Sequence, residues 1–445
     1  MLHTVSPSFS PSVNSPGLFP GWSQPDSLPI ADSPPWFQQR AAAAWKEFLA
    51  LPTPAIKDEA WRYSNAKSLA LESLRPAVGA TDAEKRDAIA RSKGVDKLAA
   101  KFVFLNDELI HTDTTALAQD VQCLPFAEAL RTQGDVLEQY FMKRPTPLGG
   151  EKFAALHLAH VRAGVVVLVP KNAVIDQPIE IFHWVAGENA LVFPHTLIVT
   201  GEYAQVTVVD HPLSLRSEAS GSIAVADLVA GRGSRITYVN SQELSRSARA
   251  LHISSTTVGR DAEVKALQLQ LGAAFSRSES VSDLVGEGAR SDMLGVSLPG
   301  EEQVVDMRTL QHHAAPRAMS DLLYKNALYD KSKTVFSGLI TVDEGAHFTD
   351  AYQKCRNLLN SAECEADSMP GLEINADQVK CSHGTTSAPI SEDELFYLKA
   401  RGIPDRDSRR LIATGFLEDV IAKLDNDLLA MHLDERIEEK FARMA

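Results

Sequence analysis

The chain has 445 residues, which is long enough for two or three domains or for one extended architecture. Its 44% hydrophobic and 23% charged residues are ordinary for a folded protein with a large core. A net charge of −14 argues against non-specific binding to nucleic acid and to anionic membranes, because both depend on basic residues. The four cysteines are too scattered for a disulfide framework, so we expect reduced thiols and a cytoplasmic location.

Residues 1–35 are predicted to form a disordered leader. They hold eight prolines and eight serines, and no lysine or arginine precedes Arg40. A secretory signal would need a basic start and an apolar centre, and a transit peptide would be rich in arginine. Neither pattern is present, and no apolar run approaches the roughly 20 residues of a membrane helix.

Residues 36–150 are predicted to be an N-terminal helical region. Residues 36–51 place apolar side chains on one stripe, and Pro52 follows as a stop signal. Residues 81–91 and 132–142 are further helix candidates. The stripe consists of Phe37, Ala41, Ala44, Trp45, Phe48 and Leu49.

Residues 151–390 are predicted to be mainly β, because short Val/Ile-rich runs alternate there with Gly, Asp and Asn. A Gly-x-x-Ala/Ser pattern recurs at Gly201, Gly231, Gly259 and Gly286, with spacings of 30, 28 and 27 residues. Strands repeating at this period, with almost no helix signal between them, predict a β-solenoid. A βαβ sheet and an antiparallel sandwich are the competing interpretations.

Residues 391–445 are predicted to be a C-terminal helical region. Ser391 and Glu394 have the spacing of a capping box. An apolar stripe at helical spacing follows from Leu411 to Leu424, and a weaker one follows after it. The stripe needs an apolar partner, which is either the chain's own solenoid or another subunit.

The candidate chemical site is VKCSHGTTSAPI at residues 379–390, which reads locally as a loop. In a strand, Cys381 and His383 would point to the same side and could face one ligand. Two ligands do not complete a metal site, and the spacings to Cys355 and Cys364 do not match a zinc finger. The alternative is a buried thiol beside a hydrogen-bonded histidine.

The remaining motifs give weaker evidence of function. The chain contains no Gly-Lys dipeptide, so it lacks the lysine loop that binds nucleotide phosphates, and no His-Glu-x-x-His occurs. His157 and His160 have a spacing that a metal could use on a helix, but no third ligand is near in sequence. We interpret this pair, and the His312-His313 dipeptide, as partly exposed surface histidines.

A series of further motifs follows in order along the chain. The motifs are DEAWRY (58–63), DLLYKNALYD (321–330), VFSGLI (335–340), TDAYQ (349–353), NLL (357–359), PGLEI (370–374), VKCSHG (379–384), RGIP (401–404) and GFL (415–417). Together they closely resemble the SufB/SufD family of the Suf iron–sulfur assembly machinery. The resemblance covers most of residues 153–424 and lies on the SufD side of the family, because SufB-type sequences carry Glu-His-Glu where Ser382-His383-Gly384 stand here.

The resemblance implies a right-handed parallel β-helix flanked by helical regions. It implies a non-catalytic scaffold that pairs with SufB through the β-helix ends and shares a transient iron–sulfur cluster with it. His383 would be the histidine implicated in cluster assembly and the candidate metal ligand. A SufC ATPase would supply the missing nucleotide site and bind the C-terminal helices, with candidate contacts at Leu411, Ile412, Phe416, Leu417 and Val420.

Cys364 is the one departure from the SufD pattern, since it falls where SufB-type sequences carry their cluster-building cysteine. It is either a retained ligand or an idle thiol at a tolerant position, and we favour the idle thiol. Two alternative functions stay open. One is a homodimeric metal-binding scaffold that uses Cys364, Cys381 and His383, and the other is a β-helix enzyme acting on carbohydrates.

Overall fold

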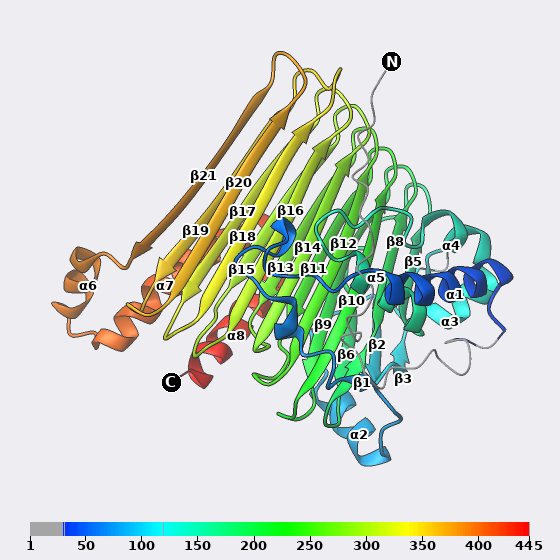
Figure 1. Cartoon of the computed structure of the whole chain (residues 1–445), viewed down its shortest axis with the longest axis horizontal. Coiled ribbons are helices and arrows are strands. Elements are labelled where there is room, and N and C mark those ends of the chain that lie inside the picture. The colour runs from blue at the N-terminus through cyan, green and yellow to red at the C-terminus, as the bar shows by residue number, and fades with distance from the viewer. Residues whose placement is uncertain (1–29, 31, 119, 445) are drawn as a thin grey trace.

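The computed structural model describes residues 30, 32–118 and 120–444, so most of the predicted leader lies outside the described residues. The described chain is a parallel β-solenoid of about eight turns with helices at both ends of the sequence (Figure 1). This confirms the predicted mainly-β solenoid and excludes both competitors. Within the described ranges, no helix is long and apolar enough to cross a membrane.

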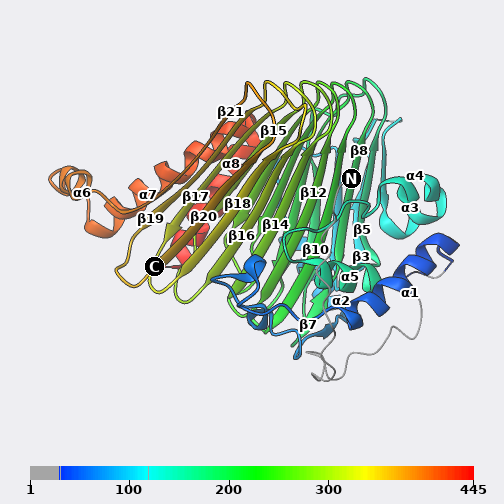
Figure 2. The same cartoon turned by 45° about the horizontal axis from the view of Figure 1, so that its top comes forward.

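Each turn of the solenoid contributes one strand to each of two sheets, which face each other across a narrow interior (Figures 1 and 2). The first sheet contains β4 (Gln122–Pro125), β5 (Ala163–Val169), β8 (Pro194–Thr200), β10 (Ser220–Ala230), β12 (Arg249–Val258), β14 (Phe275–Leu284), β16 (Val304–His313), β18 (Lys333–Val342) and β20 (Glu365–Ile374), with β7 (Ala190–Val192) paired to β10 and β1 (Arg75–Pro76) paired to β7. The second contains β2 (Ala100–Leu105), β3 (Glu108–Asp113), β6 (Ile179–Val185), β9 (Gln205–Ser214), β11 (Arg235–Gln242), β13 (Glu263–Gln270), β15 (Arg290–Ser297), β17 (Met319–Leu328), β19 (Asp350–Leu359) and β21 (Lys380–Pro389).

The repeated glycines occupy the turns, stacked one coil above the next. A Cβ atom on Gly231 would lie 2.5 Å from the carbonyl oxygen of Thr200, and one on Gly286 would lie 2.0 Å from the backbone nitrogen of Arg260. These are distances that no side chain tolerates, so the coils can stack this closely only where glycine stands. The period seen in the sequence is therefore the period of the solenoid.

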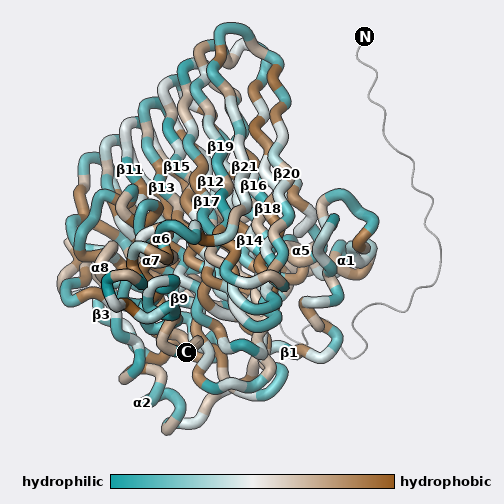
Figure 3. Tube along the Cα trace, turned by 90° about the vertical axis from the view of Figure 1, so that its left-hand side faces the viewer, coloured by the Kyte–Doolittle hydropathy of each residue, from teal (hydrophilic) through white to brown (hydrophobic). Residues whose placement is uncertain are grey.

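The interior between the sheets is filled by rows of in-register side chains, and Figure 3 shows the hydrophobic and hydrophilic residues alternating along the strands. Ile236 and Val264, paired between β11 and β13, are fully buried members of an apolar row. Amide side chains form polar rows, as where Asn326 Nδ2 donates to Asn357 Oδ1 at 2.8 Å. Such bonds between neighbouring coils satisfy part of the polar interior.

The N-terminal region contains the predicted helices and four strands that were not predicted. Its helical elements are α1 (Pro35–Ala50), η1 (Glu59–Trp61), η2 (Ala66–Leu69), α2 (Asp82–Arg91), α3 (Phe126–Thr132), α4 (Gly134–Tyr140) and α5 (Glu151–His160). α1 buries its apolar stripe except for Leu49, which is 63% exposed. Strands β2, β3 and β4 extend the two sheets at their first coil, with β3 and β4 antiparallel to their neighbours.

The C-terminal helices are α6 (Glu392–Lys399), α7 (Asp405–Ile421), η3 (Ala422–Leu424) and α8 (Asp427–Arg443). α7 and α8 lie on the outer face of the second sheet, whereas α6 extends beyond the last strand (Figures 1 and 2). The Ser391 hydroxyl accepts a hydrogen bond from the Glu394 backbone at 3.5 Å, which is half of the predicted capping box. Between the two possible partners for the apolar stripe, most of the stripe packs on the chain's own solenoid.

Candidate functional site

The last turn of the solenoid, formed by β20 and β21, is open on its outer side. β20 pairs with β18 and β21 pairs with β19, and no strand of the described chain covers their other edges. Figures 1 and 2 show the two strands side by side at one end of the stack. Most residues of β21 are exposed, and the earlier strands of the stack are largely buried.

Cys381 and His383 lie on β21, so the stretch that reads as a loop is in fact a strand. Their partners in register on β19 are Ala351 and Gln353, both buried toward the interior. Cys381 and His383 therefore share the interior-facing side of the last coil, as the two-residue spacing predicts for a strand. Burial, and secondarily the charge of Asp350, raise the pKa of the Cys381 thiol, while His383 is exposed at the open end.

Cys364 lies at the other end of this turn. It occupies the connection between β19 and β20, where its Sγ lies 3.1 Å from the Ser361 carbonyl oxygen. This connection follows Leu359, which is paired with Pro389 at the end of β21. From Cys381 to that end the strand advances about 26 Å at about 3.3 Å per residue. One chain therefore does not bring Cys364 together with Cys381 and His383.

The other two thiols are interior residues. Cys355 and Cys123 are both buried, and all four cysteines are free. Burial raises the pKa of Cys355 to about 12, and Asn326 Nδ2 contacts its sulfur at 3.6 Å. A thiol held protonated in this way is a weak nucleophile and a weak ligand, so these two cysteines act as packing residues.

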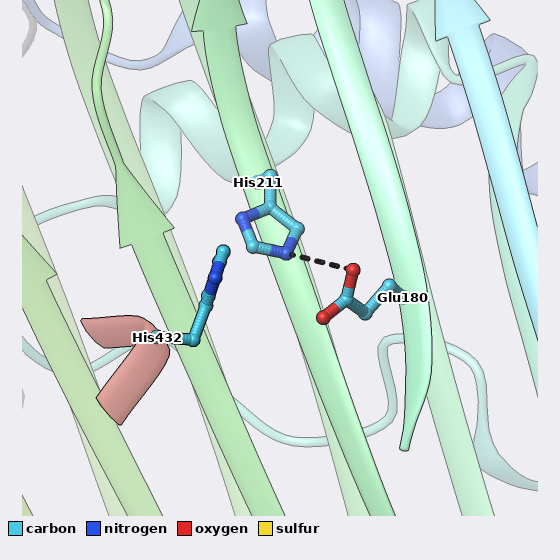
Figure 4. Close-up of side chains that lie close together, drawn as sticks. All are labelled: Glu180, His211 and His432. Carbon is cyan, nitrogen blue, oxygen red and sulfur yellow. Dashed lines mark ion pairs between the residues drawn. The ribbon is translucent and has the colours of Figure 1, made fainter. Parts of the chain in front are cut away.

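A second group of potential ligands lies on the outer face of the second sheet. Glu180 on β6, His211 on β9 and His432 on α8 each direct one ligand atom to a common point, and these atoms lie within 4.8 Å of one another (Figure 4). All three side chains are buried. His211 Nε2 lies 3.7 Å from Glu180 Oε2, which is beyond hydrogen-bond length. No local sequence motif indicates this group, because its members are far apart in sequence.

The protonation of this group suits ligand binding. Burial alone would raise the pKa of Glu180, but His211 and the Val95 backbone N–H outweigh it and hold that pKa below its usual range. Burial, reinforced by His211, lowers the pKa of His432 to about 4. At neutral pH the group therefore contains a carboxylate and a neutral His432 imidazole, which are the forms that metals bind.

His157 and His160 are not surface residues, so that prediction is wrong. α5 packs its histidine-bearing face against the solenoid, and both side chains are buried. His157 Nδ1 lies 2.9 Å from the Ile223 carbonyl oxygen, and its Nε2 lies 3.2 Å from Nδ1 of His195. His195 Nε2 in turn lies 3.3 Å from Asp227. The apolar neighbours on α5 were the available signal that this face is buried.

The two histidines of the His312-His313 dipeptide differ from each other. His313 is fully buried, whereas His312 is partly exposed and lies between two aspartates. Its Nδ1 is 2.8 Å from Asp283 and its Nε2 is 3.0 Å from Asp343. These contacts, chiefly the hydrogen bond to Asp283, raise the pKa of His312 to about 9. The surface interpretation therefore holds for His312 alone.

The predicted SufC-contact residues fall into three groups by burial. Leu417 and Val420 are fully buried against the solenoid. Phe416 is half-buried, with the Lys325 ammonium 4.6 Å from its ring, and Ile412 is also half-buried. Leu411 is 53% exposed and is the member of the set most open to a partner.

Additional apolar side chains are exposed on α6, which the sequence did not single out as a contact surface. Phe396 is 73% exposed and Tyr397 is 56% exposed. The Arg401 guanidinium lies 3.7 Å from the Tyr397 ring. Because α6 begins at Glu392, directly after β21 ends at Pro389, this apolar surface adjoins the open turn.

Two models of known protein families match this chain. The core-domain model of the SufBD proteins, described as part of SUF system FeS cluster assembly, matches residues 183–416, and the SufBD N-terminal region matches residues 24–181. The core match alone covers more than half of the chain. The chain therefore belongs to the SufBD family of iron–sulfur cluster assembly proteins.

Among curated relatives, the iron–sulfur cluster assembly protein SufD of Bacillus subtilis is 27% identical over 70% of this chain and 72% of its own. An iron–sulfur cluster assembly SufBD family protein of Synechocystis is 25% identical over 84% of both chains. A SufBD family protein of Staphylococcus saprophyticus is 28% identical over 65% of this chain and 62% of its own.

Proposed function

We propose that this chain is a SufD-like scaffold subunit that pairs with SufB and helps to build a nascent iron–sulfur cluster at the shared interface. The observation that carries the proposal is the open last turn, where His383 faces the interior side of an uncovered strand. Family membership supports the cluster as cargo. The chain has no catalytic role in this proposal, and ATP hydrolysis belongs to SufC.

The free edge of β21 is suited to pairing with a partner. Lys380 donates its N–H to the carbonyl oxygen of Thr349, directly before β19, and alternate residues of a parallel strand bond to opposite neighbours. The N–H groups of Cys381, His383, Thr385 and Ser387 therefore point to the open side. Another chain that adds a strand there would satisfy all four.

The free edge of β20 lacks one hydrogen-bond donor, because it contains a proline. The Glu365 N–H donates to the carbonyl oxygen of Ser332, directly before β18, so the open-side positions of β20 are the even-numbered residues from 366 to 374. Pro370 occupies one of these positions, where it has no N–H to offer. β21 is therefore the more capable pairing edge, and it is the strand that carries His383.

An incomplete ligand set at this edge is consistent with a shared site. Cys381 and His383 supply two donors, Cys364 is remote, and three or four ligands are needed to hold a metal. The partner would contribute the remaining ligands. His383 is the stronger candidate of the pair, because it is exposed at the interface whereas the Cys381 thiol is partly buried with a raised pKa.

SufC would bind on the C-terminal helices, where Phe396 and Tyr397 on α6 and Leu411 on α7 are exposed. This revises the predicted contact set, because Leu417 and Val420 already serve the chain's own core. The adjacency of α6 to β21 gives a route by which ATP-driven movement of SufC could reach the cluster-building edge. Phe396→Ala combined with Leu411→Ala should weaken SufC binding and leave folding intact, and normal SufC binding would contradict this assignment.

The central test is His383→Ala in the complex with SufB and SufC. Co-purification of the three proteins should be retained, and the cluster formed on reconstitution, followed by visible absorbance and circular dichroism, should fall by roughly tenfold or more, the scale for loss of a metal-site group. His111→Ala on β3, at the opposite end of the solenoid, is the matched control. An unchanged cluster yield would assign His383 a structural role.

A proline pair tests the edge itself. Thr385→Pro removes an N–H that faces the open side, so it should reduce SufB binding with little loss of stability. Thr386→Pro removes an N–H that bonds to β19, so it should destabilise the last coil even without a partner. Full SufB affinity in Thr385→Pro would show that pairing does not use this edge.

The alternative is a homodimer that pairs two copies of β21 when SufB is absent. The same free N–H groups on β21 favour a homodimer, and a measurement of the oligomeric state distinguishes the homodimer from the pair with SufB. A stable dimer of the isolated chain that persists with SufB present, and that retains iron and sulfide, would support the homodimer over the shared interface.

A further inference from the structure

The group formed by Glu180, His211 and His432 is a set of buried polar atoms whose needs the described chain does not meet. Glu180 Oε2, His211 Nε2 and His432 Nε2 are each buried and without a hydrogen-bond partner among the described residues. An unsatisfied buried polar atom costs free energy, and here three of them converge on one point. Figure 4 shows the three side chains turned toward one another from two strands and one helix.

We propose that Glu180, His211 and His432 form a binding site for one divalent transition-metal ion of the zinc or ferrous type, independent of the cluster-building edge. Two imidazoles and one carboxylate are a donor set that both ions use in proteins. The inference does not depend on the proposed scaffold function.

The distances fit this assignment. Metal bonds of about 2.0–2.2 Å in tetrahedral geometry put neighbouring ligand atoms about 3.4 Å apart. The ligand atoms here are 3.7 Å apart for His211 and Glu180 and at most 4.8 Å apart for the set. Closing the site requires movements of about 1.4 Å or less, which His432 can supply because it lies on the surface helix α8.

The surroundings hold the ligands in place. Glu180 Oε1 accepts a hydrogen bond from the Val95 N–H at 3.1 Å, which leaves Oε2 free to bind. The His211 ring stacks on Phe182 at 4.4 Å and 9°. A Cβ atom on Gly94 would lie 1.3 Å from Glu180 Oε2, so only glycine at that position leaves the carboxylate its place. Such outer contacts orient ligands in known metal sites.

A metal ion could reach the group from outside. His211 and His432 line a pocket of about 910 Å³ between the second sheet, α8 and the end of α2. Three protein ligands leave a fourth position for water or a small anion. Arg91, Lys93 and Arg436 also line the pocket and favour an anionic occupant.

Metal binding would tie α8 to the sheet, because one ligand comes from the helix and two come from the strands. The site would then act as a clamp on the C-terminal helices. Exchange of the α8 backbone amides should slow when the ion binds, since local opening of the helix would require its release.

The test is metal titration of the purified full chain after treatment with a chelator. Zn²⁺ and Co²⁺ should each bind at about one ion per chain, Co²⁺ should give visible bands of a nitrogen and oxygen site, and Zn²⁺ should raise Tm and slow amide exchange in α8. Glu180→Gln, which keeps the acceptor for Val95, and His432→Ala should each weaken binding tenfold or more. The double variant Cys381→Ser/His383→Ala is the control and should bind normally.

Three results would overturn the proposal. One is a wild-type chain that is folded yet binds neither ion, which would mean that buried water satisfies the group. Another is full affinity in Glu180→Gln. The third is loss of binding in the Cys381→Ser/His383→Ala control, which would move the site to the last turn. If His432→Ala does not fold, Glu180→Gln still decides, because it preserves side-chain size and the hydrogen bond from Val95.

Discussion

Arg277→Met should be among the most destabilising single changes in this protein. The guanidinium is fully buried, donating from Nε to Glu279 at 2.7 Å and from Nη1 to Asp306 at 2.5 Å. Arg308 also pairs with Asp306, so two cations balance two anions in the first sheet. Removing Arg277 leaves two buried carboxylates with one cation, and breaking a buried pair in this way costs about 3–5 kcal/mol.

The same side chain attaches the N-terminal region to the solenoid. Its Nη2 donates to the carbonyl oxygens of Ala60 and Leu148 at 2.9 and 2.7 Å, and the guanidinium lies 3.8 Å from the centre of the Trp61 ring. These contacts explain the aromatic-rich stretch at residues 58–63, because the Trp61 ring packs over the buried Arg277 guanidinium. Arg277→Met should therefore also expose this stretch to protease.

Urea unfolding followed by tryptophan fluorescence measures the change in the free energy of unfolding. The control is Arg317→Met, because Arg317 is 61% exposed and its pair with Glu287 at 2.8 Å is worth about 0–1 kcal/mol. Burial raises the pKa of Glu279 and Arg277 opposes that rise. In the variant Glu279 should therefore protonate more readily, and the loss of stability should shrink as pH falls. A loss no greater than that of Arg317→Met would refute the reasoning.

Two further predictions concern His312 and the stacked glycines. The folded-state pKa of His312, about 9, is above its usual 6.5, so its stabilisation should be complete below pH 6.5 and disappear as pH rises through 9. His312→Asn should remove that slope from urea midpoints measured between pH 6 and 10, and an unchanged slope would contradict it. Gly286→Ala should cost several kcal/mol, because its Cβ would meet backbone at 2.0 Å, whereas Gly384→Ala, with nothing within 4 Å, should cost under about 0.5 kcal/mol. Equal thermal midpoints for the two glycine variants would show that coil stacking tolerates the methyl group.

The solenoid could be predicted because its constraint is local and repeated. Gly231 and Gly286 must be glycine for the coils to approach each other, so the period appears directly in the sequence. The helix at residues 82–91 could be predicted because Thr81 and Glu84 form a capping box, again a local interaction. By contrast, β2 and β4 gain stability by pairing with strands far along the chain, so no local pattern revealed them.

The candidate sites likewise divide into features set by local sequence, which could be predicted, and features set by long-range packing, which could not. The strand spacing of Cys381 and His383 correctly predicted a shared face, because two residues in one strand have a fixed geometry. The group of Glu180, His211 and His432 could not be predicted, since three separate elements assemble it only after the solenoid is stacked and α8 is docked. Likewise, Leu417 and Leu411 share an apolar stripe in the sequence, and only packing decides that one is core and the other surface.

The two ends of the solenoid differ in the strand edges that they leave exposed. At the first coil, the outermost strands β3 and β4 are short and run antiparallel to their neighbours. At the last coil, β20 and β21 are ten residues each and continue the parallel stack. A long exposed edge promotes aggregation unless it is interrupted or covered. Pro370 interrupts β20, whereas in β21 the only proline is the final residue.

In the proposed function another chain covers the uninterrupted edge of β21, and the same strand carries the incomplete pair of ligands. A scaffold that completes its site only with its partner needs both features on one strand. Under the proposed function, the uncovered edge and the missing ligands have one explanation, which is that cluster assembly starts only after the subunits have paired.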